Sequence, residues 1–162
     1  MSVSPNMSER HPVPQPPLNL DVSMPELTRA LLDYESVSGN ERTIADAVHT
    51  ALSFCPHLQL TRDGDAIIAR TEFPPLPGAE GERARIILAG HLDTVPLPTV
   101  EGSLGTVPST VREEDGPSVL YGRGATDMKG GVAVQLKLRI QLAITFLLSR
   151  SMVTRCFQRY SM

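Results

Sequence analysis

Tryptophan is absent from the 162 residues, and aromatic residues make up only 4% of them. A nucleic-acid surface built on stacked aromatic side chains is therefore not expected. Basic residues are not in excess either, because the formal net charge is -3; a nucleic-acid-binding domain usually carries a basic patch. We expect no nucleic-acid partner.

Long apolar runs and cysteine pairs are also missing. The longest apolar run, 142–148, is interrupted by Thr145 and is far shorter than the roughly 20 residues of a membrane-spanning helix. The N-terminal residues are polar and lack the apolar stretch of a secretory signal. Two cysteines, Cys55 and Cys156, cannot build a disulfide framework. These features predict a cytoplasmic protein that does not contact a membrane.

The ends of the chain differ in composition from its middle. Prolines crowd the first residues (Pro12, Pro14, Pro16 and Pro17), which predicts a disordered leader over residues 1–20. All 18 acidic residues lie at or before Asp127, whereas five basic residues follow from Lys137 onward. Residues 132–162 contain no glycine, proline, aspartate or glutamate. Two interpretations of this basic end stay open: a basic tail that binds a membrane or nucleic acid, or a tail foreign to the fold, as after a frameshift or truncation.

Two helices are predicted early in the chain. Ser23 and Glu26 have the spacing of a capping box with Pro25 in the first turn, and apolar residues then recur at helical spacing. Asn40 is expected to cap a second helix that Cys55-Pro56 closes. The apolar positions of the two helices are Leu27, Ala30, Leu31 and Tyr34, and Ile44, Ala47, Val48, Ala51 and Leu52.

Strand signals alternate with the helices. Segments 58–61 and 66–70 flank Asp63-Gly64 and predict a hairpin. The apolar run 85–89 predicts a central buried strand, and 119–121 a short strand. A helical pattern begins near Lys129, with Val132, Leu136, Ile140 and Ala143 on one side. This alternation predicts an α/β fold.

The first segment that contains candidate catalytic or metal-binding residues is Gly-His-Leu-Asp-Thr-Val-Pro, residues 90–96. Positions i and i+2 of a strand face the same side, so Asp93 can accept a ring N–H from His91. Such a carboxylate fixes the tautomer of a metal-bound histidine. Two alternatives stay open: a histidine base oriented by a carboxylate, for which no serine or cysteine nucleophile motif is present, and a histidine at a strand end with no role in chemistry.

The second segment is Tyr-Gly-Arg-Gly-Ala-Thr-Asp-Met-Lys-Gly-Gly, residues 121–131. It places Asp127 at a glycine-rich turn between a strand and a helix. The dinucleotide fingerprint fails, because Asp127 stands where the third glycine is needed, and no phosphate-binding Gly-Lys-Ser/Thr occurs. A carboxylate at this edge of an α/β sheet is typical of ligand and metal sites, although an aspartate capping the next helix is the alternative.

Together, the two segments resemble the co-catalytic zinc hydrolases, a family that includes succinyl-diaminopimelate desuccinylase, acetylornithine deacetylase, aminoacylase and glutamate carboxypeptidase. Residues 36–41, Ser-Val-Ser-Gly-Asn-Glu, are also similar to the family's N-terminal region. The resemblance covers residues 21–138 and is strongest to the desuccinylases. It implies that residues 21–138 are the N-terminal part of a zinc-hydrolase catalytic domain, with helices packed on an incomplete mixed sheet, followed by a divergent basic tail over 139–162.

The resemblance also implies roles for the candidate residues. His91 would bind one of two zinc ions, with cobalt as an alternative metal, and Asp127 would bridge both. Asp93 would act in catalysis by orienting His91, and the Asp127–Met128 peptide would be cis. The implied substrate is a small N-acyl amino acid, with N-succinyl-diaminopimelate split into diaminopimelate and succinate during lysine biosynthesis. Relatives form homodimers through a domain that these residues do not contain.

The sequence departs from the family pattern after Asp127. The family uses a Glu-Glu pair, a further carboxylate and a distant histidine, but no acidic residue follows Asp127 and no histidine follows His91. We therefore expect a truncated chain that is inactive alone. A non-catalytic remnant and a partner-binding fragment are the alternatives, and acetylornithine deacetylase and metallocarboxypeptidase activity are the alternatives within the family.

Overall fold

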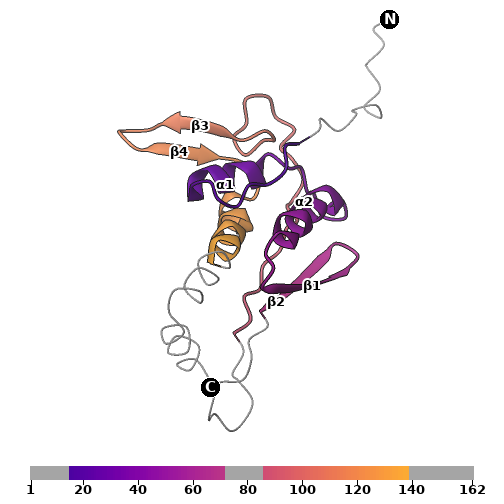
Figure 1. Cartoon of the computed structure of the whole chain (residues 1–162). Coiled ribbons are helices and arrows are strands. Elements are labelled where there is room, and N and C mark those ends of the chain that lie inside the picture. The colour runs from indigo at the N-terminus through magenta and orange to yellow at the C-terminus, as the bar shows by residue number, and fades with distance from the viewer. Residues whose placement is uncertain (1–14, 72–85, 139–162) are drawn as a thin grey trace, which may run out of the picture.

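The structure, a computed structural model, describes residues 15–71 and 86–138. Helices α1 (Met24–Leu32) and α2 (Arg42–Ser53) precede the hairpin of β1 (Leu58–Asp63) and β2 (Ala66–Thr71). A second hairpin, β3 (Thr110–Glu113) and β4 (Ser118–Tyr121), leads to the turn η2 (Ala125–Lys129). A helix then continues over residues 130–138. Figure 1 shows this last helix beneath α1, with the two hairpins on opposite sides of the helices.

The predicted α/β class is confirmed, but the sheet differs from the prediction. The strands in the described residues form two separate two-stranded antiparallel sheets, β1-β2 and β3-β4, and not one mixed sheet. The only parallel pairing in this part of the chain is an isolated bridge between Val37 and Thr94. The helices supply most of the core, and each hairpin is a peripheral addition to it.

Helix α1 begins as predicted. The Glu26 carboxylate accepts hydrogen bonds from the backbone N–H of Ser23 at 2.9 Å and from its hydroxyl at 2.6 Å. The pKa of Glu26 is lowered, first of all by the hydroxyl of Ser23. Leu27 and Leu31, one turn apart, are completely buried. The capping box and the apolar spacing therefore both form.

Helix α2 begins differently from the prediction. Its N-cap is Glu41, and Asn40 does not cap it. The reason is local: the Glu41 carboxylate turns back and accepts the backbone N–H of Gly39 at 2.6 Å. Gly39 has a φ of +90°, so the chain turns sharply before the helix. Four of the five expected apolar positions, Ile44, Val48, Ala51 and Leu52, are buried. The fifth, Ala47, is only half-buried, and Ala45 is buried in addition.

The first hairpin is confirmed, with longer strands than predicted. Asp63 pairs with Ala66, so Gly64 and Asp65 form the two-residue loop, and Gly64 takes the left-handed conformation with φ +57°. Figure 1 shows the hairpin beside α2. Leu58, Leu60, Ile67 and Ala69 pack against the core from this side.

The central strand predicted over 85–89 is not present in the described residues 86–89, and residue 85 lies outside them. Ile87 is 86% exposed, and Ile86 and Leu88 are about 40% exposed. A strand needs a hydrogen-bonded neighbour, and no described strand lies alongside this segment. Instead, the Gln135 side chain donates to the Ala89 carbonyl at 2.9 Å. Hydrophobicity alone therefore did not produce a strand.

The second hairpin was half predicted. The expected strand at 119–121 exists as β4, but its partner β3 lies inside a stretch expected to be irregular. Every residue of β3 is exposed, so no apolar alternation marks it in the sequence. Asp115 and Gly116 in the connecting loop both have positive φ values, +48° and +111°.

The hydrophobic core joins the two ends of the described chain. Val132, Ala133 and Leu136 of the last helix are buried against α1 and α2, whereas Ile140 and Ala143 lie outside the described residues. The buried cluster comprises Leu18, Leu20, Leu27, Leu31, Tyr34, Ile44, Val48, Ala51, Leu52, Val132, Ala133 and Leu136. Within the described ranges, no helix combines the length and hydrophobicity that crossing a lipid bilayer requires.

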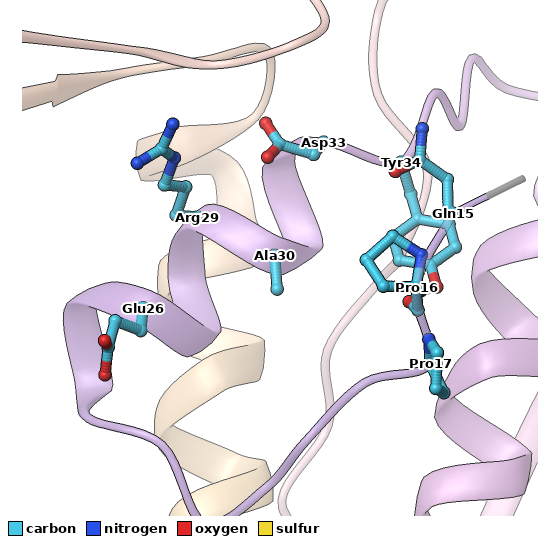
Figure 2. A pocket seen from close by; sticks show the side chains of 8 residues that line it. All are labelled: Gln15, Pro16, Pro17, Glu26, Arg29, Ala30, Asp33 and Tyr34. Atoms are coloured by element: carbon cyan, nitrogen blue, oxygen red, sulfur yellow. Dashed lines mark hydrogen bonds between the residues drawn. The ribbon is translucent and has the colours of Figure 1, made fainter. Parts of the chain in front are cut away.

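The start of the chain packs earlier than predicted. Leu18 and Leu20, inside the predicted leader 1–20, are only 7% exposed and belong to the core. The Tyr34 hydroxyl donates to the Pro16 carbonyl at 2.8 Å, and Figure 2 shows these two residues beside a small pocket at the end of α1. Residues 1–14 lie outside the described part. The packed region therefore begins before residue 21, because two leucines follow the prolines and reach the core.

Candidate functional site

The segment that carries His91 and Asp93 is fixed by backbone hydrogen bonds to the loop after α1. Thr94 N–H donates to the Ser36 carbonyl at 2.8 Å, and Ser38 N–H donates to the Thr94 carbonyl at 3.0 Å. These two bonds form the parallel bridge between Val37 and Thr94. The Ser36 hydroxyl adds a third bond, to the Leu92 carbonyl at 2.7 Å. Residues 92–94 are therefore held along 36–38.

Asp127 reaches the same place from the turn η2. Gly124 opens this turn with a left-handed φ of +81°, and Lys129 N–H donates to the Gly124 carbonyl at 2.9 Å. Asp127 and Met128 leave helical geometry, with φ near -130°. The turn is therefore kinked at Asp127 and is not a regular helix. The Asp127–Met128 peptide is cis, as the family resemblance implies.

His91 and Asp127 come together although they are far apart in sequence. His91 Nε2 lies 3.0 Å from Asp127 Oδ1. The side chains are 45% and 86% exposed, so a ligand can approach both from solvent. This proximity agrees with the arrangement that the family resemblance implies for the two residues, whereas their role as metal ligands stays a prediction.

Asp93 lies on the other side of the imidazole. His91 Nδ1 is 3.2 Å from Asp93 Oδ1 and 3.1 Å from the Asp93 backbone carbonyl. The remaining carboxylate oxygen, Oδ2, accepts the hydroxyl proton of Ser38 at 2.5 Å. The predicted His91–Asp93 contact is thus present, and Ser38 extends it by one further residue.

These contacts alter the ionisation of both groups. The pKa of His91 is raised above 6.5, first by the hydrogen bond to Asp127 and then by the Asp93 carbonyl. The pKa of Asp93 is lowered below 3.8, first by the Ser38 hydroxyl. Metal-free His91 therefore retains its proton more strongly than an ordinary histidine, and Asp93 stays ionised.

Lys129, two residues after Asp127, is buried with a relative exposure of 1%. Its ammonium donates to the Tyr34 carbonyl at 2.7 Å, which ties η2 to the end of α1. Burial lowers the pKa of Lys129 to about 8, and the charge of Asp33 opposes this effect. From the sequence, Lys129 was expected only to mark the start of a helix.

A cavity of about 490 Å³ lies beside His91 and Asp93. Ile67 and Ala69 of β2, Leu88 and Leu136 are among its apolar lining residues, and Glu41 and Asp65 add two carboxylates. The pocket in Figure 2, about 230 Å³, contains none of the three candidate residues and is bordered by α1 and residues 15–17. The larger cavity is therefore the one that adjoins the predicted chemistry.

The donor atoms fit part of a zinc site. Imidazole nitrogen and carboxylate oxygen are common zinc ligands, and metal–ligand bonds of about 2.0–2.2 Å bring two ligands of one ion roughly 3–3.5 Å apart. The Nε2–Oδ1 separation of 3.0 Å is close to this range. No group of three or more His, Cys, Asp or Glu side chains arranged for a metal occurs in residues 15–71 and 86–138. The described residues thus offer two ligands of the usual four.

A comparison with known proteins places these residues in a family. Residues 87–159 match the model of peptidase family M20/M25/M40, a range that includes His91, Asp93 and Asp127. This match runs 21 residues past residue 138, where the resemblance was expected to end. The boundary between residues 21–138 and a tail over 139–162 therefore stays a prediction.

Individual relatives agree with the family match. The chain is 43% identical over 119 residues to a Mycobacterium tuberculosis protein that is named for succinyl-diaminopimelate desuccinylase; the match covers 73% of this chain and 29% of that protein. It is 39% identical to succinyl-diaminopimelate desuccinylase of Corynebacterium glutamicum, covering 72% and 28%. Acetylornithine deacetylase of Pectobacterium atrosepticum is 34% identical, covering 65% and 28%.

The chain spans less than a third of the length of these curated relatives. The stretch that matches the family model nevertheless contains all three candidate site residues. With its two motifs and these matches, the chain belongs to the M20/M25/M40 peptidase family.

Proposed function

We propose that His91 and Asp127 bind the same zinc ion and that the chain is part of an amidohydrolase acting on N-acyl amino acids. The observation that supports this proposal is the 3.0 Å approach of His91 Nε2 to Asp127 Oδ1 from two distant motifs. Asp93 would orient His91 from the opposite ring nitrogen, at 3.2 Å. Because the two donors are exposed, the ion and a substrate could reach them without a change in the fold.

The chain's own residues would prepare the metal ligand. His91 Nδ1 faces the Asp93 backbone carbonyl at 3.1 Å and the Asp93 carboxylate at 3.2 Å. A proton held on Nδ1 by these acceptors would leave Nε2 free to bind a metal ion once its own proton is lost. The raised pKa of His91 means that zinc must displace a proton that is held more strongly than usual. Bound zinc would polarise the amide carbonyl and lower the pKa of a water molecule.

The proposed reaction is hydrolysis of N-succinyl-diaminopimelate in lysine biosynthesis. Water adds across the amide bond, so that the acyl carbon gains the hydroxyl group and becomes succinate, while the nitrogen gains a proton and leaves as the free amine of diaminopimelate. The names of the two relatives with 43% and 39% identity support this substrate. The 34% identity to an acetylornithine deacetylase makes N-acetylornithine the second candidate.

We further propose that these 162 residues do not catalyse the reaction alone. No acidic residue follows Asp127, and no histidine follows His91, so the general base and the second set of ligands of the family pattern are not identified here. A general base commonly contributes about 10²- to 10⁴-fold to a rate. We propose the cytoplasm as the compartment, because two cysteines cannot build the disulfide framework that is common in secreted proteins.

Zinc content and amide hydrolysis test the proposal together. The chain, loaded with zinc and freed of excess metal, should retain zinc, whereas H91A and D127A should lose most of it. D46N removes a carboxylate that pairs with Arg62 and should retain zinc as the wild type does. Neither N-succinyl-diaminopimelate nor N-acetylornithine should be hydrolysed measurably. Zinc retention that is unchanged in H91A and D127A would refute the shared site, and robust turnover would refute the inactivity.

A further inference from the structure

The segment Ser36-Val37-Ser38 contacts the site without contributing a proposed metal ligand. The Ser38 hydroxyl donates to Asp93 Oδ2 at 2.5 Å, across 55 residues of sequence. This carboxylate is the one whose other oxygen lies 3.2 Å from His91 Nδ1. Ser38, Asp93, His91 and Asp127 therefore form a continuous chain of polar contacts.

A carboxylate has little intrinsic preference that would fix this geometry. The terminal torsion of an aspartate, χ2, is broad and roughly two-fold, so the carboxyl group can rotate when nothing holds it. In this structure each carboxylate oxygen of Asp93 has a different neighbour: Oδ1 lies 3.2 Å from His91 Nδ1, and Oδ2 accepts the Ser38 hydroxyl. The Asp93 backbone carbonyl, 3.1 Å from the same nitrogen, is the second neighbour of Nδ1. Ser38 is thus the contact that selects one rotation of the carboxylate.

The backbone places Ser38 for this contact. Ser38 N–H is bonded to the Thr94 carbonyl at 3.0 Å, directly after Asp93. The Thr94 carbonyl is also the alternative acceptor for the hydroxyl, but at 3.4 Å it is far less favourable than the carboxylate. Since a hydroxyl has only one proton to donate, the short contact with the charged oxygen prevails.

We propose that Ser38 is a positioning residue, which holds the Asp93 carboxylate so that it faces His91 Nδ1. The expected effect of Ser38 on metal binding rests on the proposed function. The expected effect of Ser38 on the His91–Asp93 contact depends only on the metal-free geometry. Ser38 touches neither His91 nor Asp127 in the contacts described, so its effect passes through Asp93.

The test compares the full chain with S38A, S38T and S36A. S38A removes the donor to Asp93, and S38T keeps a hydroxyl at the same position. S36A is the matched control, because it removes a hydroxyl bond from the same segment to the Leu92 backbone carbonyl and leaves the carboxylate contact intact. Zinc affinity is measured by competition with a chromophoric chelator. The ¹⁵N resonances of the His91 ring are recorded in the metal-free protein.

In S38A the zinc dissociation constant should rise by about tenfold, the lower end of the range for residues that support a metal ligand. The His91 Nδ1 resonance should move while the Nε2 resonance changes little. S38T should restore both properties toward the wild type, and S36A should leave the ring resonances unchanged. A wild-type Nδ1 resonance in S38A, or the same displacement in S36A, would overturn the proposal. If the wild type binds no zinc, the proposed function fails, and the ring resonances alone decide the role of Ser38.

Discussion

His91 lies between two carboxylates, and its ionisation can be followed directly. Its pKa is raised, with the hydrogen bond to Asp127 as the largest cause. We predict that the pKa of His91 in the metal-free protein, measured by NMR titration, lies above 6.5 and decreases in D127N. D46N, which removes the carboxylate that pairs with Arg62, should leave the pKa of His91 unchanged.

The direction of the pH dependence follows from the sign of this change. A histidine whose pKa is higher in the folded state than in the unfolded state adds stability below the unfolded pKa. That contribution disappears as the pH rises through the raised folded pKa. Zinc affinity has the opposite dependence, because it weakens as the pH falls and protons compete for His91. A His91 pKa at or below 6.5 would contradict the prediction.

At the level of single residues, the sequence predicted those site residues that lie within a recognisable motif. His91, Asp93 and Asp127 were named from two motifs and from the family resemblance that the motifs carry, and the structure brings the three residues together. Ser38 and Lys129 were not predicted as contacts, because their partners lie 55 and 95 residues away. A serine and a lysine are ordinary surface residues until the packing of the chain places an acceptor beside them.

The turn that carries Asp127 depends on glycine at position 124. Gly124 has a φ of +81°, and an added Cβ would lie 2.7 Å from the Thr94 methyl group. Gly64 has a similarly left-handed φ of +57° but open space around it. The left-handed conformation costs a residue with a side chain about 1–2 kcal/mol. We predict that G64A loses about this much stability in urea unfolding, and that G124A loses distinctly more.

G64A is the control for backbone strain without steric overlap. Equal losses in the two variants would show that Thr94 moves aside and that Gly124 is needed for its φ alone. In that case the close packing of η2 against residues 92–94 would not limit which residue can stand at position 124.

Helix α1 should be sensitive to acid at its first turn. The pKa of Glu26 is lowered, mainly by the Ser23 hydroxyl. A carboxylate with a lowered folded pKa adds stability above its unfolded pKa, and this contribution disappears as the pH falls through the folded pKa. We therefore predict that S23A is less stable than the wild type near neutral pH. The difference should shrink below about pH 4, because an unperturbed glutamate takes up its proton in that range.

The stability difference is measured by urea unfolding at several pH values. S53A is a suitable control, because the Ser53 hydroxyl donates to the Thr50 carbonyl and not to a carboxylate. Its effect should be independent of pH in this range. A difference for S23A that stayed constant into acid would argue against the Ser23–Glu26 contact as its cause.

At the level of elements, local patterns predicted the helices better than the strands. The spacing of Leu27, Leu31, Ile44 and Val48 predicted the buried faces of α1 and α2. The strand predicted from the apolar run 85–89 was wrong for residues 86–89. A strand requires a hydrogen-bonded neighbour, and these residues have none among the described strands. Strand β3 was missed for the opposite reason: all of its residues are exposed, and it forms through pairing with β4.

For the molecule as a whole, we expect the apolar segment 86–88 to promote self-association. Ile87 is 86% exposed, and no strand in residues 15–71 and 86–138 pairs with this segment. Exposed apolar side chains on a segment without a strand partner favour intermolecular contact. We predict that I87K reduces aggregation, measured by light scattering, with little change in the unfolding temperature. F54K alters a single residue that is 80% exposed after α2 and should reduce aggregation less. An equal benefit from F54K would show that net charge, and not the segment, is responsible.

The contacts between the chain's early and late residues also bear on its synthesis. The Lys137 ammonium donates to the Leu20 carbonyl, 117 residues earlier, and Lys129 reaches the Tyr34 carbonyl. At a translation rate of about 5–20 residues per second, roughly 6–23 s separate the synthesis of Leu20 from that of Lys137. During this interval the apolar faces of α1 and α2 have been made but lack Val132, Ala133 and Leu136. A nascent chain would therefore expose these faces to ribosome-associated chaperones until residues 130–138 emerge.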